Sequence, residues 1–377
     1  TPTFEALPSY KHLVLWLTIL INKDVKEAQV VMNAVAHNEK YAPDLRGWAY
    51  KFLADTVLRL DPAQIEAVYD LRLEALSLFT NPAPDRYLEC GMMAYRVHKY
   101  EDAARYLDHY LKLRPEDEQV YYFAMESYEA THNFEAALEV MKTLNTYHPT
   151  QRTQDKYGDL LLKTKRWEEA MAFFAPLATA DPRPANVFGY AFAAEHLGQF
   201  QQAAALYDIL AKVSTDSGPG RVAALRCLYF AGMFAEMESR MHTYHDLTDQ
   251  PRKDMLGLAA QLYSILQRWE MAERMAFHYE ESFDSEPRLW EGIYEMRVAA
   301  LGAVAAYRLQ HWDKVVYFAR CLKRRSEYVP EHVWALWAEA AEKTEGKKAM
   351  SNIVLKGLVK FPNNPELLAL RERVLEL

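Results

Sequence analysis

The sequence predicts an all-α chain of about ten antiparallel helix hairpins stacked as one solenoid. One observation is a repeat: an aromatic residue followed three positions later by a small or aliphatic residue recurs at intervals of 34, 33, 33, 34, 35 and 43 residues. These aromatic residues are Tyr100, Phe134, Trp167, Phe200, Phe234, Trp269 and Trp312. The other is composition: only 13 of 377 residues are glycine, which favours helix, because a glycine inside a helix costs about 1 kcal/mol.

Each repeat contains two helical patterns separated by a short break. In residues 120–130, "VYYFAMESYEA" has apolar residues at i, i+3 and i+4, and "THN" then interrupts the pattern. A second amphipathic pattern, "FEAALEVMKTLNTY", opens at Phe134, and Pro149 ends it because proline cannot continue a helix. We expect turns at 131–133 and at the matching segments 197–199 and 231–233. One hairpin alone would expose its apolar face, so each is expected to bury that face against the next.

These features resemble the tetratricopeptide repeat family. The resemblance is strong over residues 84–214, weaker over 218–326, and returns over 331–364. The motif positions are Gly91 and Gly158 in first helices, Ala103, Ala137, Ala170 and Ala203 in second helices, and the closing Pro115, Pro149 and Pro182. The chain departs from the motif at Met237 and Val315, which replace alanine, and at Lys347, where an aromatic residue is expected. The motif is matched again at Trp334, Ala338 and Pro362. The resemblance implies a right-handed superhelix whose first helices line a concave groove.

Four segments are expected along the chain: divergent N-terminal hairpins (1–83), well-matched repeats (84–217), degenerate repeats with one insertion (218–330), and a final repeat with a capping helix (331–377). In the first segment, Asp24 and Asp61 are predicted helix N-caps, with Pro62 at the first helical position. The stretch 214–221, "STDSGPGR", is predicted to be a long loop between helices. The insertion of about nine residues falls around 282–292.

Composition restricts the class of protein. The formal net charge of −8 does not favour nucleic acid, whose binding proteins usually carry a basic face. The three cysteines, Cys90, Cys227 and Cys321, are far apart in apolar surroundings, which predicts buried thiols and mildly favours a reducing compartment. The cytoplasm is therefore slightly favoured, with the bacterial periplasm as the alternative. The apolar stretch 13–21 is too short for a membrane span and lacks a preceding basic region, so it is not expected to be a signal peptide.

The chain begins at Thr1, not methionine, which is compatible with processing or with excision from a longer protein. No GxSxG, HExxH, P-loop or GxGxxG motif is present, so we expect no enzyme activity and no cofactor. The best metal candidate, His242 and His245 with Asp246 in "HTYHD", was expected on a helix, but it lacks identifiable third and fourth ligands, and no metal site is predicted. The basic run 320–328 is expected to close a helix and to be solvated, with an acidic partner or lipid headgroups as the alternative.

The resemblance places aromatic and acidic side chains in the groove. The candidate partner-binding residues are Tyr95, Tyr122, Phe123, Glu126, Glu129, Asp159, Phe188, Phe192, Glu195, Tyr229, Phe230 and Tyr307. Aromatic side chains are common binding hot spots, and acidic neighbours favour a basic ligand. Any single aromatic residue of this set could instead pack between hairpins. Family members that grip a chaperone's C-terminal carboxylate use lysine and asparagine where this chain has Leu88, Met92, Tyr122 and Glu126, so that ligand is not expected.

The sequence therefore predicts a non-catalytic interaction scaffold or adaptor that holds a protein partner in the groove and helps to assemble a larger complex. One alternative is the periplasmic part of a bacterial secretion or exopolysaccharide-export machine, in which the groove would guide a polymer. The other is a docking or regulatory region of a larger enzyme. Self-association through the end faces of the solenoid remains open, whereas binding of nucleic acid and membrane insertion are not expected.

Overall fold

All regular structure in the described residues is helical. The structure is a computed structural model that describes residues 25–244, 246–247, 249–282, 293–326 and 329–375. The helices of the first half are α2 (Val25–Ala36), α3 (Pro43–Leu60), α4 (Ile65–Leu78), α5 (Pro84–Arg96), α6 (Tyr100–Leu113), α7 (Glu118–Ala130), α8 (Phe134–Tyr147), α9 (Gln151–Lys163), α10 (Trp167–Ala180) and α11 (Pro184–His196). Those of the second half are α12 (Phe200–Val213), α13 (Gly218–Phe230), α14 (Phe234–Met241), α15 (Asp249–Ile265), α16 (Trp269–Glu281), α17 (Ile293–Arg308), α18 (Trp312–Ser326), α19 (Glu331–Glu345), α20 (Lys347–Lys360) and α21 (Pro365–Leu375).

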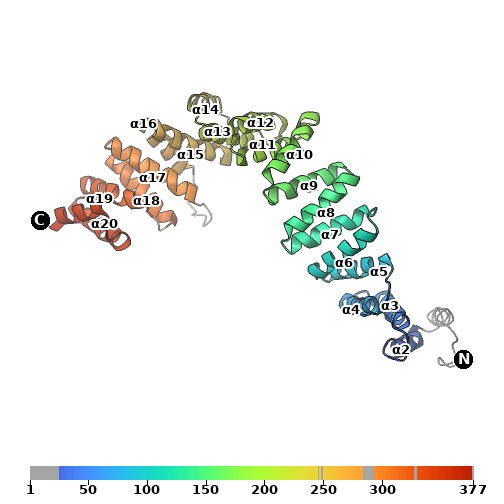
Figure 1. Ribbon diagram of the computed structural model, residues 1–377. Coiled ribbons are helices and arrows are strands. Elements are labelled where there is room, and N and C mark those ends of the chain that lie inside the picture. Colours follow the sequence, from blue (N-terminus) through green and yellow to red (C-terminus); the bar gives the residue numbers. More distant parts are fainter. Residues whose placement is uncertain (1–24, 245, 248, 283–292, 327–328, 376–377) are drawn as a thin grey trace. The chain divides into compact units, whose positions relative to one another are not determined.

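Consecutive helices pack as hairpins, as the repeat predicts (Figure 1). All seven repeat aromatic residues begin a helix, from Tyr100 at the start of α6 to Trp312 at the start of α18. The turn before each aromatic contains a residue with positive φ, two positions upstream of it. These residues are His98, His132, Lys165, Gly198, Gly232, Gln267 and Gln310. The expected turns at 131–133, 197–199 and 231–233 are therefore confirmed, and each hairpin is closed by the same left-handed conformation.

The chain divides into two compact units, residues 1–169 and 170–377, which we call unit 1 and unit 2. In unit 1 the strongest packing is within the pairs α3–α4 and α5–α6, and α7–α8 also pack together. In unit 2 the pairs α11–α12, α15–α16, α17–α18 and α19–α20 pack in the same way. In unit 2, successive first helices also contact one another, since α15 packs on α13 and on α17, and α17 on α19. These contacts between first helices position the candidate site described below.

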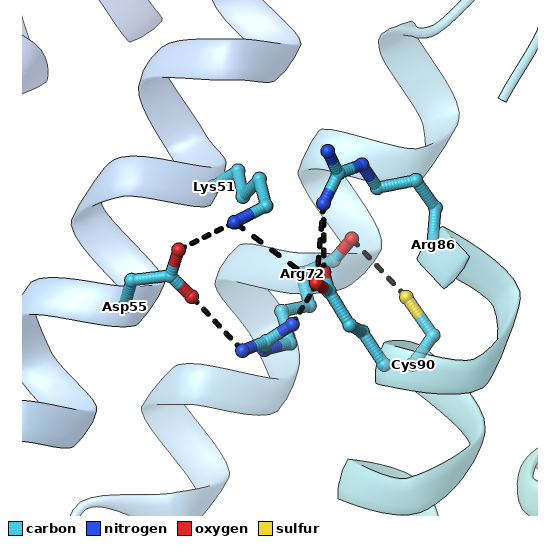
Figure 2. Close-up of polar contacts among 6 residues, drawn as sticks. Lys51, Asp55, Arg72, Arg86 and Cys90 are labelled. Atoms are coloured by element: carbon cyan, nitrogen blue, oxygen red, sulfur yellow. Dashed lines mark hydrogen bonds and ion pairs between the residues drawn. The ribbon is translucent and has the colours of Figure 1, made fainter. Parts of the chain in front are cut away.

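A buried ionic network joins three helices of unit 1 (Figure 2). The guanidinium of Arg72 on α4 is almost fully buried and bridges two carboxylates, at 3.0 Å from Asp55 on α3 and 2.5 Å from Glu89 on α5. Lys51 also binds Asp55, at 2.5 Å, and Arg86 binds Glu89, at 3.1 Å. Because each partner comes from a different helix, the network fixes how the α3–α4 hairpin packs against α5.

Glycines in first helices allow neighbouring helices to approach closely. A Cβ atom on Gly91 would lie 2.6 Å from Leu107 on α6, and one on Gly189 would lie 2.4 Å from the Phe174 ring. A Cβ atom on Gly302 would lie 2.6 Å from the Phe318 ring. The small-residue site predicted at Gly91 is thus confirmed: a large side chain of the second helix occupies the space that a Cβ would need.

Three sequence predictions are wrong. Asp61 does not cap a helix, because α4 begins at Ile65; instead its carboxylate accepts a hydrogen bond from the N–H of Ala63 in the turn after α3. The expected loop 214–221 is shorter, because α13 begins at Gly218. Gly220 is helical there for packing, since a Cβ would lie 2.9 Å from the backbone N of Ala211. His242 follows the end of α14 at Met241, so the described residues of "HTYHD", 242–244 and 246, are not on a helix.

Other predictions lie outside the described residues. These are the N-cap Asp24, the apolar stretch 13–21, His245, and the insertion apart from Ser282. The closing prolines behave as expected: Pro115 and Pro149 each follow a helix end by two residues. Proline 176, in contrast, lies inside α10, where it removes one helical N–H donor. The repeat without its aromatic residue also forms a hairpin, because α20 begins at Lys347 after the positive-φ residue Gly346.

Candidate functional site

Unit 2 contains a mostly apolar cleft of about 660 Å³ between the first helices α15 and α17. Its α17 wall is formed by Arg297, Ala300, Leu301 and Val304, which are spaced i, i+3, i+4 and i+7 and therefore share one helix face. The α15 wall is formed in the same way by Gln261, Ser264 and Ile265. Tyr229, Trp269, Pro330 and His332 complete the lining. The surface of the cleft is mostly apolar, although Gln261, Ser264 and Arg297 place polar groups in its walls.

The cleft exposes apolar surface to solvent. The side chain of Ile265 is 51% exposed although it lies on a helix that is otherwise well packed. Leu301 and Val304 are half-buried, so each presents part of its side chain to the opening. An exposed, concave apolar surface of this kind is typical of ligand and partner sites in soluble proteins.

Charged groups in the cleft are cationic. Arg297 lies in its wall, and Arg308, one further step along the same face of α17, has its guanidinium 5.9 Å from the centre of the Trp269 ring. No carboxylate belongs to the lining, and neither arginine forms an ion pair with a described residue. The local field therefore favours neutral or acidic groups.

One buried polar atom lies in the wall of the cleft. Within the described part of the chain, the Ser264 hydroxyl oxygen is buried and has no hydrogen-bond partner. A buried hydroxyl without a partner is unfavourable by roughly 1–3 kcal/mol. Because this oxygen is closed off from solvent, a ligand in the cleft would reach it only if the Ser264 side chain rotated toward the opening.

Exposed aromatic side chains continue from the cleft on α11 and α13. Phe188 and Phe192 stack on α11 with ring centres 5.3 Å apart. On α13, Phe230 is 56% exposed, and its ring lies 5.5 Å from that of Tyr229, a residue of the cleft lining. These four residues belong to the set predicted from sequence, but only Tyr229 lines the cleft itself.

The predicted groove residues of unit 1 connect neighbouring hairpins. The Tyr95 hydroxyl donates a hydrogen bond to Glu126, which raises the pKa of Tyr95 to about 12, and its ring contacts Phe123. Glu129 forms an ion pair with Lys163 on α9. Each of these contacts joins a first helix to the next first helix, so part of the predicted acidic surface is already paired within the protein.

The remaining predicted residues differ in exposure. Tyr122 is buried beneath the Arg152 guanidinium, which lies 4.1 Å from its ring centre. Asp159 is exposed, yet the surrounding protein raises the pKa of its carboxyl by partial desolvation, and the nearby lysines oppose this shift. The Tyr307 hydroxyl donates a hydrogen bond to Glu339 on the next first helix, which raises the pKa of Tyr307 to about 12.

Glu195 is the most strongly engaged carboxylate of the set. It accepts two hydrogen bonds from Arg226, at 2.8 and 2.9 Å, and one from the Tyr207 hydroxyl at 2.7 Å. Burial alone would raise the pKa of this carboxyl, but the hydrogen bonds from Arg226 and Tyr207 outweigh it and lower the pKa below its usual value. The ion pair therefore joins α11 to α13 and leaves little negative charge for a partner.

Several solved helical-repeat structures are similar to this chain at low sequence identity. No protein-family model matches the sequence, and no curated protein matches it. Among solved structures, it is similar to the Cut9–Hcn1 hetero-tetramer of the APC/C, with 13% identity over 97% of this chain and 84% of the other, and a TM-score of 0.39. A tetratricopeptide repeat protein from Parabacteroides merdae is 13% identical over 67% of this chain and 98% of the other, with a TM-score of 0.35. PilF of Pseudomonas aeruginosa is 15% identical over 58% of this chain and 96% of the other, with a TM-score of 0.38.

With TM-scores below 0.5, these similarities carry nothing about what the chain binds. Its own geometry decides the architecture: helix hairpins at intervals near 34 residues, each closed by a left-handed turn and an aromatic residue. The chain is a tetratricopeptide-like helical-repeat protein.

Sequence reasoning missed most of the cleft. Apart from His332, its lining lies in the degenerate segment 218–330, where the motif is weak, and of this lining only Tyr229 was predicted. A usable signal was present: Leu301 and Val304 on α17, and Ile265 on α15, are large apolar residues on the same helix faces as polar ones. The repeat aromatic Trp269 both begins α16 and lines the cleft.

The described residues contain no cluster suited to metal binding, since no three His, Cys, Asp or Glu side chains are grouped closely enough. Asp246, from the predicted histidine cluster, instead binds Arg221 through both carboxylate oxygens, at 2.8 and 2.9 Å. All three cysteines are buried as expected, and burial raises the pKa values of the Cys90 and Cys227 thiols to about 12. These thiols are therefore poor nucleophiles.

Proposed function

We propose that this protein is a non-catalytic scaffold that holds a segment of a partner protein in the cleft between α15 and α17. The observation that carries the proposal is the cleft itself: about 660 Å³, mostly apolar, and open to solvent with Ile265 half exposed. Apolar side chains of a partner would cover Ile265, Leu301 and Val304. The aromatic residues on α13 and α11 would extend the contact.

The charge of the cleft selects among partners. With Arg297 in the wall and Arg308 beside Trp269, a neutral or acidic segment is favoured over a basic one. The basic partner expected from sequence rests on the carboxylates of first helices, of which Glu129 and Glu195 are already ion-paired. A basic partner thus stays a prediction for the unit 1 surface, around the exposed Glu126 and Asp159.

The same geometry supports the proposal that the protein helps to assemble a larger complex. The cleft uses one face of two helices, so the other exposed helix faces remain available for further partners. Such a scaffold brings partners together without chemistry of its own.

Two isoleucines of unit 2 allow a matched test. Ile265 in the cleft is 51% exposed, and Ile209 on α12, outside the cleft, is 41% exposed. A photo-crosslinking amino acid at position 265 or 209 of the full chain, activated in the native cells, should join a protein only from position 265. The Ile265→Asp variant should lose capture of that protein by at least tenfold, because binding would bury the new carboxylate. Ile209→Asp should retain capture, because a carboxylate at position 209 stays in solvent.

Equal crosslinking from both positions would contradict the proposal. So would capture that survives Ile265→Asp in a chain whose far-ultraviolet circular dichroism and melting temperature match those of the wild type. A crosslink confined to position 265 whose partner is a glycan would instead favour the polymer-guiding alternative.

A further inference from the structure

A second surface lies on α20, away from the cleft, and differs from the rest of the protein in charge. The sequence of this helix, "KKAMSNIVLKGLVK", contains four lysines and no acidic residue, although the whole chain has a net charge of −8. All four lysines, Lys347, Lys348, Lys356 and Lys360, are exposed. The helix therefore concentrates positive charge on its solvent side.

Two apolar side chains protrude between these lysines. Leu355 is 56% exposed and Val359 is 84% exposed, and their i, i+4 spacing puts them on one helix face. Lys348, seven residues before Leu355, shares that face, and Lys356 borders it. The opposite face, with Met350, Ile353 and Val354, is buried in the core of unit 2. The exposed side of α20 is thus both apolar and cationic.

Neighbouring carboxylates on α19 do not neutralise Lys347, Lys348 and Lys356. The acidic side chains of α19 bind other partners: Glu331 accepts from Asn364, Glu339 from Tyr307, Glu342 pairs with Arg373, and Glu345 with Arg320. Among the described residues, Lys347, Lys348 and Lys356 form no ion pair. Their charge therefore faces solvent uncompensated.

We infer that the exposed face of α20 docks onto an anionic lipid surface. Exposed lysines flanking protruding apolar residues on one helix are the combination that places a helix in the headgroup region, with apolar side chains inserted and lysines at the phosphates. None of the described helices is long and apolar enough to cross a bilayer, so the contact is peripheral. The lysine stems can extend along the apolar boundary while the ammonium groups stay hydrated.

The chemistry favours lipid over an acidic protein. All four cations are lysines, and lysine is depleted at protein interfaces, where arginine's planar group binds carboxylates through two hydrogen bonds. A lysine ammonium is a hydrated point charge that suits a diffuse layer of phosphates. Only two apolar side chains protrude, which is little for a stable protein interface but adds usefully to electrostatic adsorption.

Vesicle sedimentation of the full chain tests this inference. At about 0.1 M salt the protein should pellet with vesicles of phosphatidylcholine and phosphatidylserine in a 70:30 ratio and not with phosphatidylcholine alone, and about 0.5 M salt should release it. Lys348→Glu/Lys356→Glu should lower the partition coefficient at least tenfold. Leu355→Ser/Val359→Ser should lower it about fivefold, because both side chains lose their insertion.

Two controls make the result specific. Lys142→Glu/Lys156→Glu changes the net charge equally but replaces exposed lysines on α8 and α9, and it should change the partition coefficient less than twofold. Ile265→Asp, in the cleft, should leave vesicle binding unchanged, so the cleft and the lipid surface are tested separately. Melting temperatures of all variants establish that they are folded.

Absence of sedimentation with the anionic vesicles would overturn the inference, and so would equal loss in the α8–α9 control variant. Poly-L-glutamate is the competing probe. If it binds the chain through Lys348 and Lys356 while the vesicles do not, or if the Leu355/Val359 variant sediments like the wild type, the face is a site for an acidic macromolecule instead of a lipid surface.

Discussion

The residue that closes each hairpin repeats as regularly as the aromatic that follows it. Seven residues with positive φ lie two positions before the aromatic that begins the next helix, and only Gly198 and Gly232 among them are glycine. A side chain in the left-handed conformation costs roughly 1 kcal/mol. The other five positions therefore carry a small, local destabilisation that the packing of the hairpins offsets.

Lysine 165 offers the simplest test of this point, because it is exposed and its φ is 58°. Lys165→Gly should raise the free energy of unfolding by about 0.5–1 kcal/mol, measured by urea denaturation. Gly198→Ala, at φ 74° with no atom near the added Cβ, should lower it by a similar amount. As a control, Lys156→Gly inside α9 should lower it by about 1 kcal/mol. A destabilised Lys165→Gly variant would show that the turn is not under strain.

The sequence predicted the helix starts and ends that depend only on residues close by in the chain. The aromatic residues begin helices and the prolines follow helix ends, because both effects act within one turn of chain. Asp61 was misassigned because an aspartate before proline suits either an N-cap or a turn. The choice depends on where α4 first finds its packing partner, which the local sequence does not contain.

At the scale of elements, unit 1 is held partly by buried charge. Arg72 lies between Asp55 on α3 and Glu89 on α5, with only 9% of its side chain exposed. The pairing compensates for the desolvation of three charges, so it fixes the helix arrangement more than it adds stability. Without Arg72, Asp55 would keep Lys51 and Glu89 would keep Arg86, but the ion pairs that join α4 to α3 and to α5 would be lost.

Arg72→Met removes both of these ion pairs and should lower the free energy of unfolding of unit 1 by about 1–3 kcal/mol. The matched change Arg105→Met removes an exposed arginine paired with Asp102 and should lower it by less than about 0.5 kcal/mol. Chemical denaturation followed by circular dichroism measures both. Equal effects would mean that the Arg72 network is not a special feature of the α3–α4–α5 packing.

Helix boundaries were largely predictable, but helix faces were not. The period of apolar residues placed the helices, whereas it could not tell that Tyr122 is buried or that Glu195 is bound by Arg226, because both depend on the neighbouring hairpin. The glycines of α13 were read as loop residues, although Gly220 is helical and lies against α12. A glycine required by close packing looks, in sequence, like one required by a turn.

At the scale of the whole molecule, the candidate sites lie away from the repeats that match the motif best. The cleft uses α13, α15, α17 and α19, mostly in the segment where the motif is degenerate, and the cationic apolar face lies on α20. Residues that keep the motif serve the packing of one hairpin on the next. Residues that depart from it, such as the exposed Ile265, are available to bind.

Amide hydrogen exchange of the full chain, alone and with the protein crosslinked from position 265 after its purification, tests the central claim most directly. The account predicts slower exchange on binding in α15 and α17 around Ile265 and Leu301, and unchanged exchange in α6 and α8. Protection confined to the first helices of unit 1, with α15 and α17 unchanged, would contradict it and would return the binding site to the groove around Glu126 and Asp159.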